Sequence, residues 1–427
     1  MQVVRTLELA SAIGPDLIAL RRRLHQIPEL GMRLPLTQRA VLEALDGLDL
    51  EITLGESLSS VVAVLRGRGT TAGAGAGAGA GVGAVAAERP VVLLRGDMDA
   101  LPVTEDLPLD FVSQHEGLMH ACGHDLHVAG LVGAARILHE LRDELEGDVV
   151  FMFQPGEEGP GGAQPMIDEG LLDVAGRRVD AAYALHVYSS EYPLGTWFGR
   201  PGPLMAAADE VRVRVVGEGG HGSQPFRAKD PIPVACEIVV ALQTLVTRQF
   251  DVFDPVVITV GKFVGGTKDN IIPDDAVFEA TLRSLSEQAR ADVAAKIELL
   301  ATRLAEAHGL TAEVEYLPGY PVTVNDESEY SFAKDTIVDL FGADRYAHQR
   351  DPEMGSEDFA FVGAKVPSAY VNLSACPAPD FASAPDNHSP RAEFDDSVVP
   401  DGSALLAELA LRRLRQLAAT VGSAGAS

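Results

Sequence analysis

The residues best suited to bind a metal ion are concentrated in one short segment, His120-Ala-Cys122-Gly-His124-Asp125-Leu-His127. Thiolates and imidazoles are ligand types that zinc-like ions prefer, and a loop that precedes a helix can wrap such an ion. The segment could equally hold ordinary polar residues around a buried thiol. A nucleophilic Cys122 is a third interpretation, because cysteine hydrolases pair a thiolate with a histidine. The partners in such enzymes usually converge from distant segments, so the closeness of His124 favours a ligand over a nucleophile.

Two further segments place carboxylates directly after apolar, strand-like runs. Asp99 follows such a run at residues 91–94, and Glu157 and Glu158 follow another at 149–153. Because sites in α/β proteins are built at the carboxyl ends of strands, we expect these carboxylates at one sheet edge. Asp99 could orient a metal-bound imidazole. Of the two glutamates, one could bind a metal while the other takes a proton from the attacking water and returns it to the leaving amine. A structural turn and an exposed acidic loop are the alternatives.

Two more histidines complete a set that is spread over much of the chain. His186 lies in the apolar run 181–187, and His388 lies in Asn387-His-Ser-Pro390 near the end. A single histidine in a strand is more often a satisfied core residue than a ligand. The argument depends instead on five residues of suitable type in loops or strands of one α/β unit. The candidate metal ligands are Cys122, His124, Glu158, His186 and His388.

A later region carries side chains suited to hold a substrate. His221 lies between glycines, and Asn270 and Arg283 follow it. A histidine or an asparagine could stabilise an oxyanion, and an arginine could bind a carboxylate through two hydrogen bonds. A turn histidine and a surface arginine are the alternatives.

The elements that must position these residues indicate two folding units. Apolar runs at 91–94, 149–153 and 181–187 alternate with helical stretches such as 127–141, which is typical of an α/β layer architecture. From residue 210 the pattern changes to alternating strands, and the helix expected at 292–308 has one apolar face. This later region predicts a smaller α+β unit.

The expected division places the first part of an α/β catalytic domain at residues 1–207, an inserted α+β lid or dimerisation domain at 208–319, and the second catalytic part at 320–427. Residues 69–87 are dominated by Gly and Ala, which supply little side chain to bury, so we expect a flexible loop there. The first helix is expected to begin near Pro15.

Length, charge and cysteine content limit the class of protein. At 427 residues the chain exceeds what one hydrophobic core usually serves. A net charge of −28, without a basic cluster to offset it, argues against nucleic acid as a partner. Three cysteines provide no disulfide framework and fit a reducing compartment, so a cytoplasmic location is expected. No apolar run approaches the roughly 20 residues that span a bilayer, so we expect no membrane partner.

Taken in order, these motifs resemble the metal-dependent aminoacylase, hippurate hydrolase and indole-acetyl-amino-acid hydrolase family of co-catalytic metallopeptidases. The resemblance extends from Arg22-Arg-Leu-His-Gln-Ile-Pro-Glu-Leu-Gly31 through Met354-Gly-Ser-Glu-Asp-Phe359 to Asn387-His-Ser-Pro390. It implies a mixed-sheet catalytic domain of the zinc-peptidase type and an inserted lid domain that commonly mediates dimerisation. A homodimer or homotetramer is therefore expected. The Gly/Ala-rich insertion after Arg68 is the main departure from the family pattern.

The resemblance also implies roles for the candidate residues. The five candidate ligands would hold two divalent ions, zinc or manganese first and cobalt or nickel as alternatives. Glu157 would be the general base, Asp99 the supporting aspartate, and His221 a histidine that assists at the oxyanion, in related dimers at the neighbouring subunit's site. Asn270 or Arg283 would hold the substrate carboxylate.

The expected reaction is hydrolysis of the amide bond of a small-molecule N-acyl amino acid. A dipeptidase or other exopeptidase on the same site is the first alternative. A noncatalytic small-molecule binding protein is the second alternative. The sequence does not identify the acyl group or the native metal.

Overall fold

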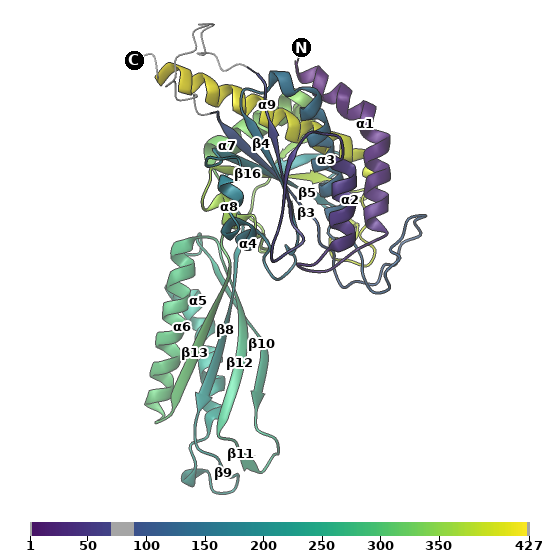
Figure 1. The fold of residues 1–427 in the computed structure, drawn as a ribbon. Helices are drawn as coiled ribbons and strands as arrows, with labels where there is room; N and C mark the ends of the chain where they lie inside the picture. Colours follow the sequence, from purple (N-terminus) through teal and green to yellow (C-terminus); the bar gives the residue numbers. More distant parts are fainter. Residues whose placement is uncertain (1, 70–88, 425–427) are drawn as a thin grey trace. The chain divides into compact units, whose positions relative to one another are not determined.

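The chain forms two compact units in the computed structural model, which describes residues 2–69 and 89–424 (Figure 1). The first unit runs to Gly202 and continues with Asn325–Arg350 and from Phe361 onwards. The second unit comprises Pro203–Val324 and Asp351–Ala360. The inserted domain expected at residues 208–319 lies within the second unit. Apart from Gly69, the expected Gly/Ala-rich loop lies outside the described residues.

The first unit is built on an eight-stranded mixed sheet. Its strand order is β1-β2-β4-β3-β5-β16-β6-β15. The central strands β4, β3, β5 and β16 are parallel to their neighbours in that group, whereas β1 and β2 pair antiparallel at one side. The strands are β1 (Glu51–Leu54), β2 (Val61–Arg66), β3 (Val91–Asp97), β4 (Asp148–Gln154), β5 (Ala181–Tyr188), β6 (Trp197–Gly199), β15 (Tyr346–His348) and β16 (Ser368–Ser374). Every residue of β3, β4 and β16 is buried, as continuous apolar runs predict for strands covered on both faces. The expected α/β class with a mixed sheet is confirmed.

Helices cover this sheet. The helices α3 and α9 pack against the central strands β3 and β5, α1 packs on α3 and α9, and α7 packs against β16 (Figure 1). Their bounds are α1 (Gln2–His25), α2 (Pro35–Leu45), α3 (His124–Glu140), α4 (Ala163–Asp168), α7 (Glu327–Phe341) and α9 (Val399–Ala424), and the short α8 spans Ala360–Gly363. The expectation that the first helix begins near Pro15 was wrong, because α1 starts at Gln2 and contains this proline. Packing of α1 on α3 and α9 holds the helix together across a residue that lacks a backbone donor.

The register of the parallel strands brings several segments to one sheet edge. Asp97, the last residue of β3, pairs with Gln154, the last residue of β4. On the other side of β3, Arg95 pairs with Ala184 of β5, so His186 lies at the level of Asp97. The segments that follow β3 and β4 and the end of β5 therefore emerge together at the carboxyl edge, where sites in α/β proteins are built.

The second unit is an antiparallel sheet with two helices on one face (Figure 1). Its strand order is β10-β12-β8-β13, and α5 and α6 pack against it. The elements are β8 (Ala207–Val216), α5 (Pro231–Gln249), β10 (Val256–Gly265), β12 (Asp275–Ser284), α6 (Glu287–Ala307) and β13 (Thr311–Tyr320). Two small ribbons pair β9 (Gly220–His221) with β11 (Ile271–Ile272) and β7 (Gly202–Met205) with β14 (Thr323–Asn325).

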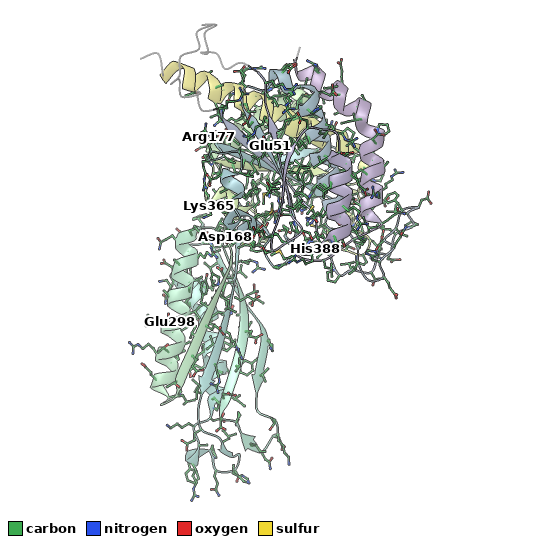
Figure 2. The ribbon with its side chains drawn as sticks, in the orientation of Figure 1. Glu51, Asp168, Arg177, Glu298, Lys365 and His388 are labelled. Atoms are coloured by element: carbon green, nitrogen blue, oxygen red, sulfur yellow. The ribbon has the colours of Figure 1, made fainter. Side chains whose placement is uncertain are left out.

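Alternation and capping explain the elements of the second unit. Along β12, buried residues alternate with partly exposed ones, as in a strand with one covered face. The helix α6 begins after Ser286, whose side chain accepts a hydrogen bond from the Ala289 N–H, and ends before Gly309 at φ +73°. Val293 and Ile297 of α6 are buried, whereas Glu298, labelled in Figure 2, lies on the exposed side.

One described helix, α5, has the length and apolar composition of a membrane-spanning helix. This finding is weak evidence, because core helices of other proteins pass the same test. Val234, Ile238, Leu242 and Leu245 of α5 belong to the hydrophobic core of the second unit. The apolar face of α5 is thus used for packing on the sheet.

Candidate metal centre and active site

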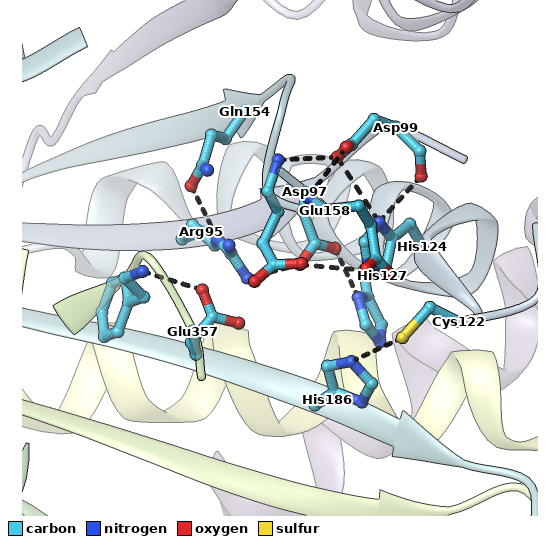
Figure 3. Close-up of polar contacts among 12 residues, drawn as sticks. Arg95, Asp97, Asp99, Cys122, His124, His127, Gln154, Glu158, His186 and Glu357 are labelled. Atoms are coloured by element: carbon cyan, nitrogen blue, oxygen red, sulfur yellow. Dashed lines mark hydrogen bonds and ion pairs between the residues drawn. The ribbon is translucent and has the colours of Figure 1, made fainter. Parts of the chain in front are cut away.

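The thiol of Cys122 lies between two imidazoles that come from distant parts of the chain. Its Sγ atom is 3.4 Å from Nε2 of His186 and 3.3 Å from Nε2 of His388. Figure 3 shows Cys122 facing His186, which projects from β5. Two ligands of one tetrahedral ion, an imidazole and a thiolate, lie about 3.5 Å apart at ordinary bond lengths. The observed separations match that spacing.

Glu158 and His124 extend this cluster. Oε1 of Glu158 is 3.2 Å from Nε2 of His388 and 3.8 Å from Nε2 of His124. Ligand atoms of Cys122, His124 and His186 lie within 4.8 Å of one another, and so do those of Cys122, Glu158 and His388. The structure therefore brings all five candidate ligands together. Because the two groups share Cys122, they suit a pair of neighbouring ions.

Backbone contacts aim the imidazoles at this cluster. Nδ1 of His124 donates to the carbonyl of Asp99 over 2.8 Å, and Nδ1 of His186 donates to the carbonyl of Val187 over 2.8 Å. With the proton on Nδ1, each Nε2 presents a lone pair to the cluster, which is the usual arrangement of a metal-bound histidine. Among the described residues, the buried Nε2 of His124 has no hydrogen-bond partner. Such an orphaned atom fits a ligand of a metal ion.

The charges at the cluster also suit a cation. Burial raises the pKa of the Cys122 thiol well above its usual value, and the charges of Glu158 and Glu157 raise it further. Without a cation, a thiol in this environment keeps its proton and is poorly suited to act as a nucleophile, whereas a bound metal ion would supply the positive charge that a thiolate needs here. Burial lowers the pKa of His124, but the negative charges of Asp97, Asp99 and Glu158 outweigh this effect and raise it to about 10. In the metal-free site His124 therefore carries a positive charge of its own, and a bound cation would take the place of its Nε2 proton.

Glycine allows the chain to turn between two of the candidate ligands. Gly123, between Cys122 and His124, has φ +79°, and a Cβ atom there would lie 2.4 Å from Cγ2 of Val187. A side chain at this position would be strained and would also collide with β5. Helix α3 begins at His124 and not at residue 127 as expected, so this ligand lies in the first helical turn.

Asp99 holds the two glutamates through their backbone. One carboxylate oxygen of Asp99 accepts a hydrogen bond from the Glu157 N–H and the other accepts one from the Glu158 N–H, both over 3.0 Å. The contact of Asp99 with His124 runs through its backbone carbonyl, whereas its carboxylate Oδ1 is 3.6 Å from Nδ1 of His124. Gly156, at φ +77°, allows the turn that precedes the glutamates. The loop between β4 and α4 is thereby tied to the end of β3.

Glu157 belongs to the same site and is only 8% exposed. A carboxylate oxygen of Glu157 lies within 4.8 Å of the ligand atoms of His124 and Glu158. Two adjacent carboxylates thus reach one cluster from a single loop, and only Glu158 belongs to the group with Cys122 and His388. This arrangement suits one carboxylate that binds metal and one that transfers protons.

A network behind the ligands was not expected from the sequence. Arg95 donates from Nη1 to Asp97 over 2.5 Å and from Nε to Gln154 over 2.9 Å (Figure 3). His127 donates from Nδ1 to Asp97 over 2.5 Å and accepts from the Val187 N–H at Nε2 over 2.9 Å. Both ring nitrogens of His127 are used by the chain, so His127 lies behind the candidate ligands and is not counted among them. The sequence contained one sign of this role. His127 lies three residues after His124, and residues at that spacing share one face of a helix.

The remaining candidate residues belong to the second unit. His221 lies in β9, where its Nδ1 accepts from the Ser223 N–H over 3.1 Å, and Asn270 directly precedes the paired strand β11. The carbonyl of Asn270 accepts from the Gly222 N–H over 2.9 Å, so His221 and Asn270 share one ribbon. Arg283 of β12 donates from Nη1 to Thr281 and Leu282 and from Nε to the carbonyl of Met354.

Comparison with known proteins identifies the family. A sequence profile described as "Peptidase family M20/M25/M40" matches residues 93–412, which is more than half of the chain. The chain belongs to this family. An "IAA-amino acid hydrolase ILR1-like 4" from Arabidopsis thaliana is 36% identical over 410 residues, covering 95% of this chain and 87% of that protein. An "N-acetyl-L-cysteine deacetylase" from Bacillus subtilis is 33% identical over 404 residues, covering 95% and 89%.

A solved structure supports the same assignment. A dinuclear metal-binding peptidase of family M20 from Bacillus subtilis superimposes with a TM-score of 0.78 at 30% identity, covering 95% of this chain and 99% of that one. The resemblance to the metal-dependent aminoacylase and hydrolase group is confirmed, and so is the fold. This member of family M20 is therefore a metal-dependent amidohydrolase. Membership of this hydrolase family argues against the second alternative, a noncatalytic small-molecule binding protein.

Proposed function

We propose that this M20 amidohydrolase cleaves the amide bond of N-acyl amino acids, with Glu157 as the general base. The observation that carries the proposal is the loop that Asp99 fixes, because it directs Glu157 and Glu158 at one cluster of metal-ligand atoms. Two relatives, an IAA-amino acid hydrolase and an N-acetyl-L-cysteine deacetylase, support a substrate of this kind.

The five candidate ligands would hold two divalent ions. They are Cys122, His124, Glu158, His186 and His388, and their atoms form the two overlapping groups described above. When bound, such ions polarise a carbonyl group and make a water molecule more acidic. Zinc and manganese are proposed first, with cobalt and nickel as alternatives, since ligand type alone does not settle selectivity.

Glu157 carries the proton between the two halves of the reaction. Its carboxylate takes a proton from the attacking water, and the hydroxyl oxygen adds to the carbonyl carbon of the amide. The carbon–nitrogen bond then breaks, and Glu157 returns the proton to the leaving nitrogen. The products are a carboxylic acid and a free amino acid. Only a carboxylate that is not itself a metal ligand can do this, which is why the distinction between Glu157 and Glu158 matters.

Residues of the second unit are proposed to hold the substrate. His221 would donate to the oxyanion, and Asn270 or Arg283 would hold the carboxylate of the amino acid. Arg283 would have to release its contacts with Leu282 and Met354 to bind a carboxylate through two donors. The second unit is also proposed to form the interface of a homodimer or homotetramer.

A cytoplasmic location completes the proposal. It is supported by the three cysteines, all of which are unpaired thiols.

The deciding experiment is a substrate panel on the metal-free protein reloaded separately with zinc, manganese, cobalt or nickel. N-acyl amino acids, dipeptides and peptides with a free carboxyl end are assayed side by side. The proposal expects the largest kcat/KM for N-acyl amino acids. An exopeptidase, the alternative suggested by the peptidase in the structural comparison, would prefer the peptides.

A further inference from the structure

Asn387, directly before His388, ties three parts of the metal centre together. Its Oδ1 accepts hydrogen bonds from the Ser189 N–H and from the Ser189 hydroxyl, both over 2.9 Å. Its Nδ2 donates to the carbonyl of Val187 over 3.0 Å. The same Nδ2 lies 3.7 Å from Sγ of Cys122. One carboxamide therefore contacts the end of β5 and the thiol of a proposed metal ligand.

The loop that carries His388 needs such a tie. His388 has φ +69°, a left-handed conformation that is unfavourable for a residue with a Cβ atom. Its N–H donates to the carbonyl of Ala121 over 2.8 Å, which fixes the backbone beside Cys122. Strained backbone persists only where the surroundings hold it. The hydrogen bonds of Asn387 to residues 187 and 189 supply that restraint from the other side.

The contact of Asn387 with the sulfur of Cys122 differs in kind from the contacts that His186 and His388 make with the same atom. Nε2 of His186 and Nε2 of His388 can offer a lone pair to an ion, whereas the amide nitrogen of Asn387 has only N–H bonds to offer. Its interaction with Sγ is therefore a donated hydrogen bond. Hydrogen bonds to a ligating thiolate withdraw charge from the sulfur and tune its bond to the metal.

The carbonyl of Val187 links this contact to His186. It accepts from Nδ2 of Asn387 and also from Nδ1 of His186, and the second bond aims Nε2 of His186 at Cys122. Asn387 thus contacts Cys122 directly, His186 through a shared carbonyl, and His388 through the chain.

We propose that Asn387 is a positioning residue of the metal centre, which holds the His388 loop against β5 and donates a hydrogen bond to the Cys122 thiolate. This inference rests on the proposed function insofar as Cys122, His186 and His388 are the metal ligands. It adds a residue that sets the strength of metal binding and the electron density on the sulfur.

The test uses metal-free full-length protein titrated with Co²⁺, and it measures the dissociation constant and the thiolate-to-cobalt charge-transfer band in the near ultraviolet. Asn387→Asp keeps the acceptor that faces Ser189 and removes the amide N–H groups that face sulfur and the carbonyl of Val187. Asn387→Ala removes the acceptor as well. Ser189→Ala is the matched control, because it removes a hydrogen bond from the same loop and leaves the contact with sulfur in place.

We expect both Asn387 variants to weaken Co²⁺ binding about 10–100-fold, the usual effect of losing a partner behind a ligand. Their charge-transfer band should move to longer wavelength, because loss of the N–H donor raises the energy of the sulfur lone pair. Ser189→Ala should leave the band in place. Far-ultraviolet circular dichroism of the metal-free variants checks that they fold. If Asn387→Ala does not fold, the result for Asn387→Asp decides the test.

An unchanged dissociation constant and an unchanged band in Asn387→Asp would overturn the proposal. Weaker Co²⁺ binding with an unchanged charge-transfer band would overturn the proposal as well, because that is the result expected of a variant that only loosens the loop. Neither measurement uses turnover. A parent protein that fails to hydrolyse N-acyl amino acids would therefore reject the proposed function without deciding this inference.

Discussion

Nδ1 of His127 lies 2.5 Å from Oδ1 of Asp97, and both side chains are almost fully buried. The other ring nitrogen of His127 accepts from the N–H of Val187, the residue after His186. The pair therefore connects the end of β3 with the end of β5, directly behind the proposed metal ligands. Burial lowers the pKa of His127, which keeps the ring neutral and able to accept this hydrogen bond.

Loss of the Asp97–His127 pair should weaken metal binding. In Asp97→Asn, one acceptor oxygen must serve both His127 and Arg95, so the support of β5 is disturbed. We expect the dissociation constant for zinc to rise about 10–100-fold, measured by competition with a chromophoric chelator. Asp180→Asn is the matched control, since Asp180 accepts from the Val91 N–H at the opposite end of β3. Equal zinc affinity in the two variants would refute this role for Asp97.

Asp99 should affect turnover by placing Glu157. Asp99→Asn leaves a single acceptor for the N–H groups of Glu157 and Glu158, and its amide group would face one of them. A displaced general base lowers kcat, because small errors in its position cost about 100-fold in rate. We expect a fall in kcat of at least about 10-fold with a smaller change in KM. The measurement is steady-state kinetics on the best substrate of the panel, and an unchanged kcat would contradict the proposed placement.

Substitutions of the neighbouring residues Glu157 and Glu158 should change different properties of the enzyme. Glu157→Gln removes the proton carrier, and we expect kcat to fall about 10²–10⁴-fold while the metal content per subunit stays the same. Glu158→Gln removes a candidate ligand beside His388, so metal content itself should fall. Metal analysis of each purified variant, together with kcat, separates the two roles. Full turnover by Glu157→Gln would exclude it as the general base.

A buried ion pair in the second unit should make stability depend on acid pH. Asp209 accepts two hydrogen bonds from Arg290 and one from the Gly319 N–H, and it is 3% exposed. Burial raises the pKa of Asp209, but these hydrogen bonds outweigh it and hold the pKa below its usual value. The stabilisation is therefore complete above the unfolded pKa of about 3.9 and is lost as the pH falls through the lower folded value.

Asp209→Asn should accordingly lower the free energy of unfolding by about 3 kcal/mol at pH 7. This deficit should shrink as the pH drops below about 3.9. Urea unfolding at pH 7 and at pH 3 measures both effects. Arg303→Gln is the control, because the pair of Arg303 with Glu306 is exposed and should contribute less than about 1 kcal/mol. A deficit that stays constant with pH would contradict the assignment.

Much of the fold was readable because the relevant patterns are local. Continuous apolar runs at 91–94, 149–153 and 181–187 correspond to β3, β4 and β5, since strands covered on both faces need apolar side chains on both. Element ends were less accurate, as the starts of α1 and α3 show. The left-handed backbone of Gly123 and packing across Pro15 decide those ends, and neither follows from apolar spacing alone.

Residue type and order were enough to propose the site. Glu158 follows shortly after β4 and His186 lies near the end of β5, so both must reach one sheet edge once those strands are parallel, and Cys122 could be added as a candidate by its residue type beside His124. Their distances to one another could not be predicted. His388 reaches Cys122 across 266 positions of the chain, and its left-handed backbone is held by contacts that its own segment does not determine.

The sequence by itself determined the chemical groups, their order along the chain and the class of sheet that brings them together. Only the tertiary structure decided how those groups are held: which nitrogen of each imidazole faces the cluster, that both ring nitrogens of His127 bond to the chain, and that Asn387 contacts Cys122. The physical reason is that hydrogen bonds between residues far apart in sequence depend on the packing of whole strands and helices. No spacing rule within a single segment encodes that packing.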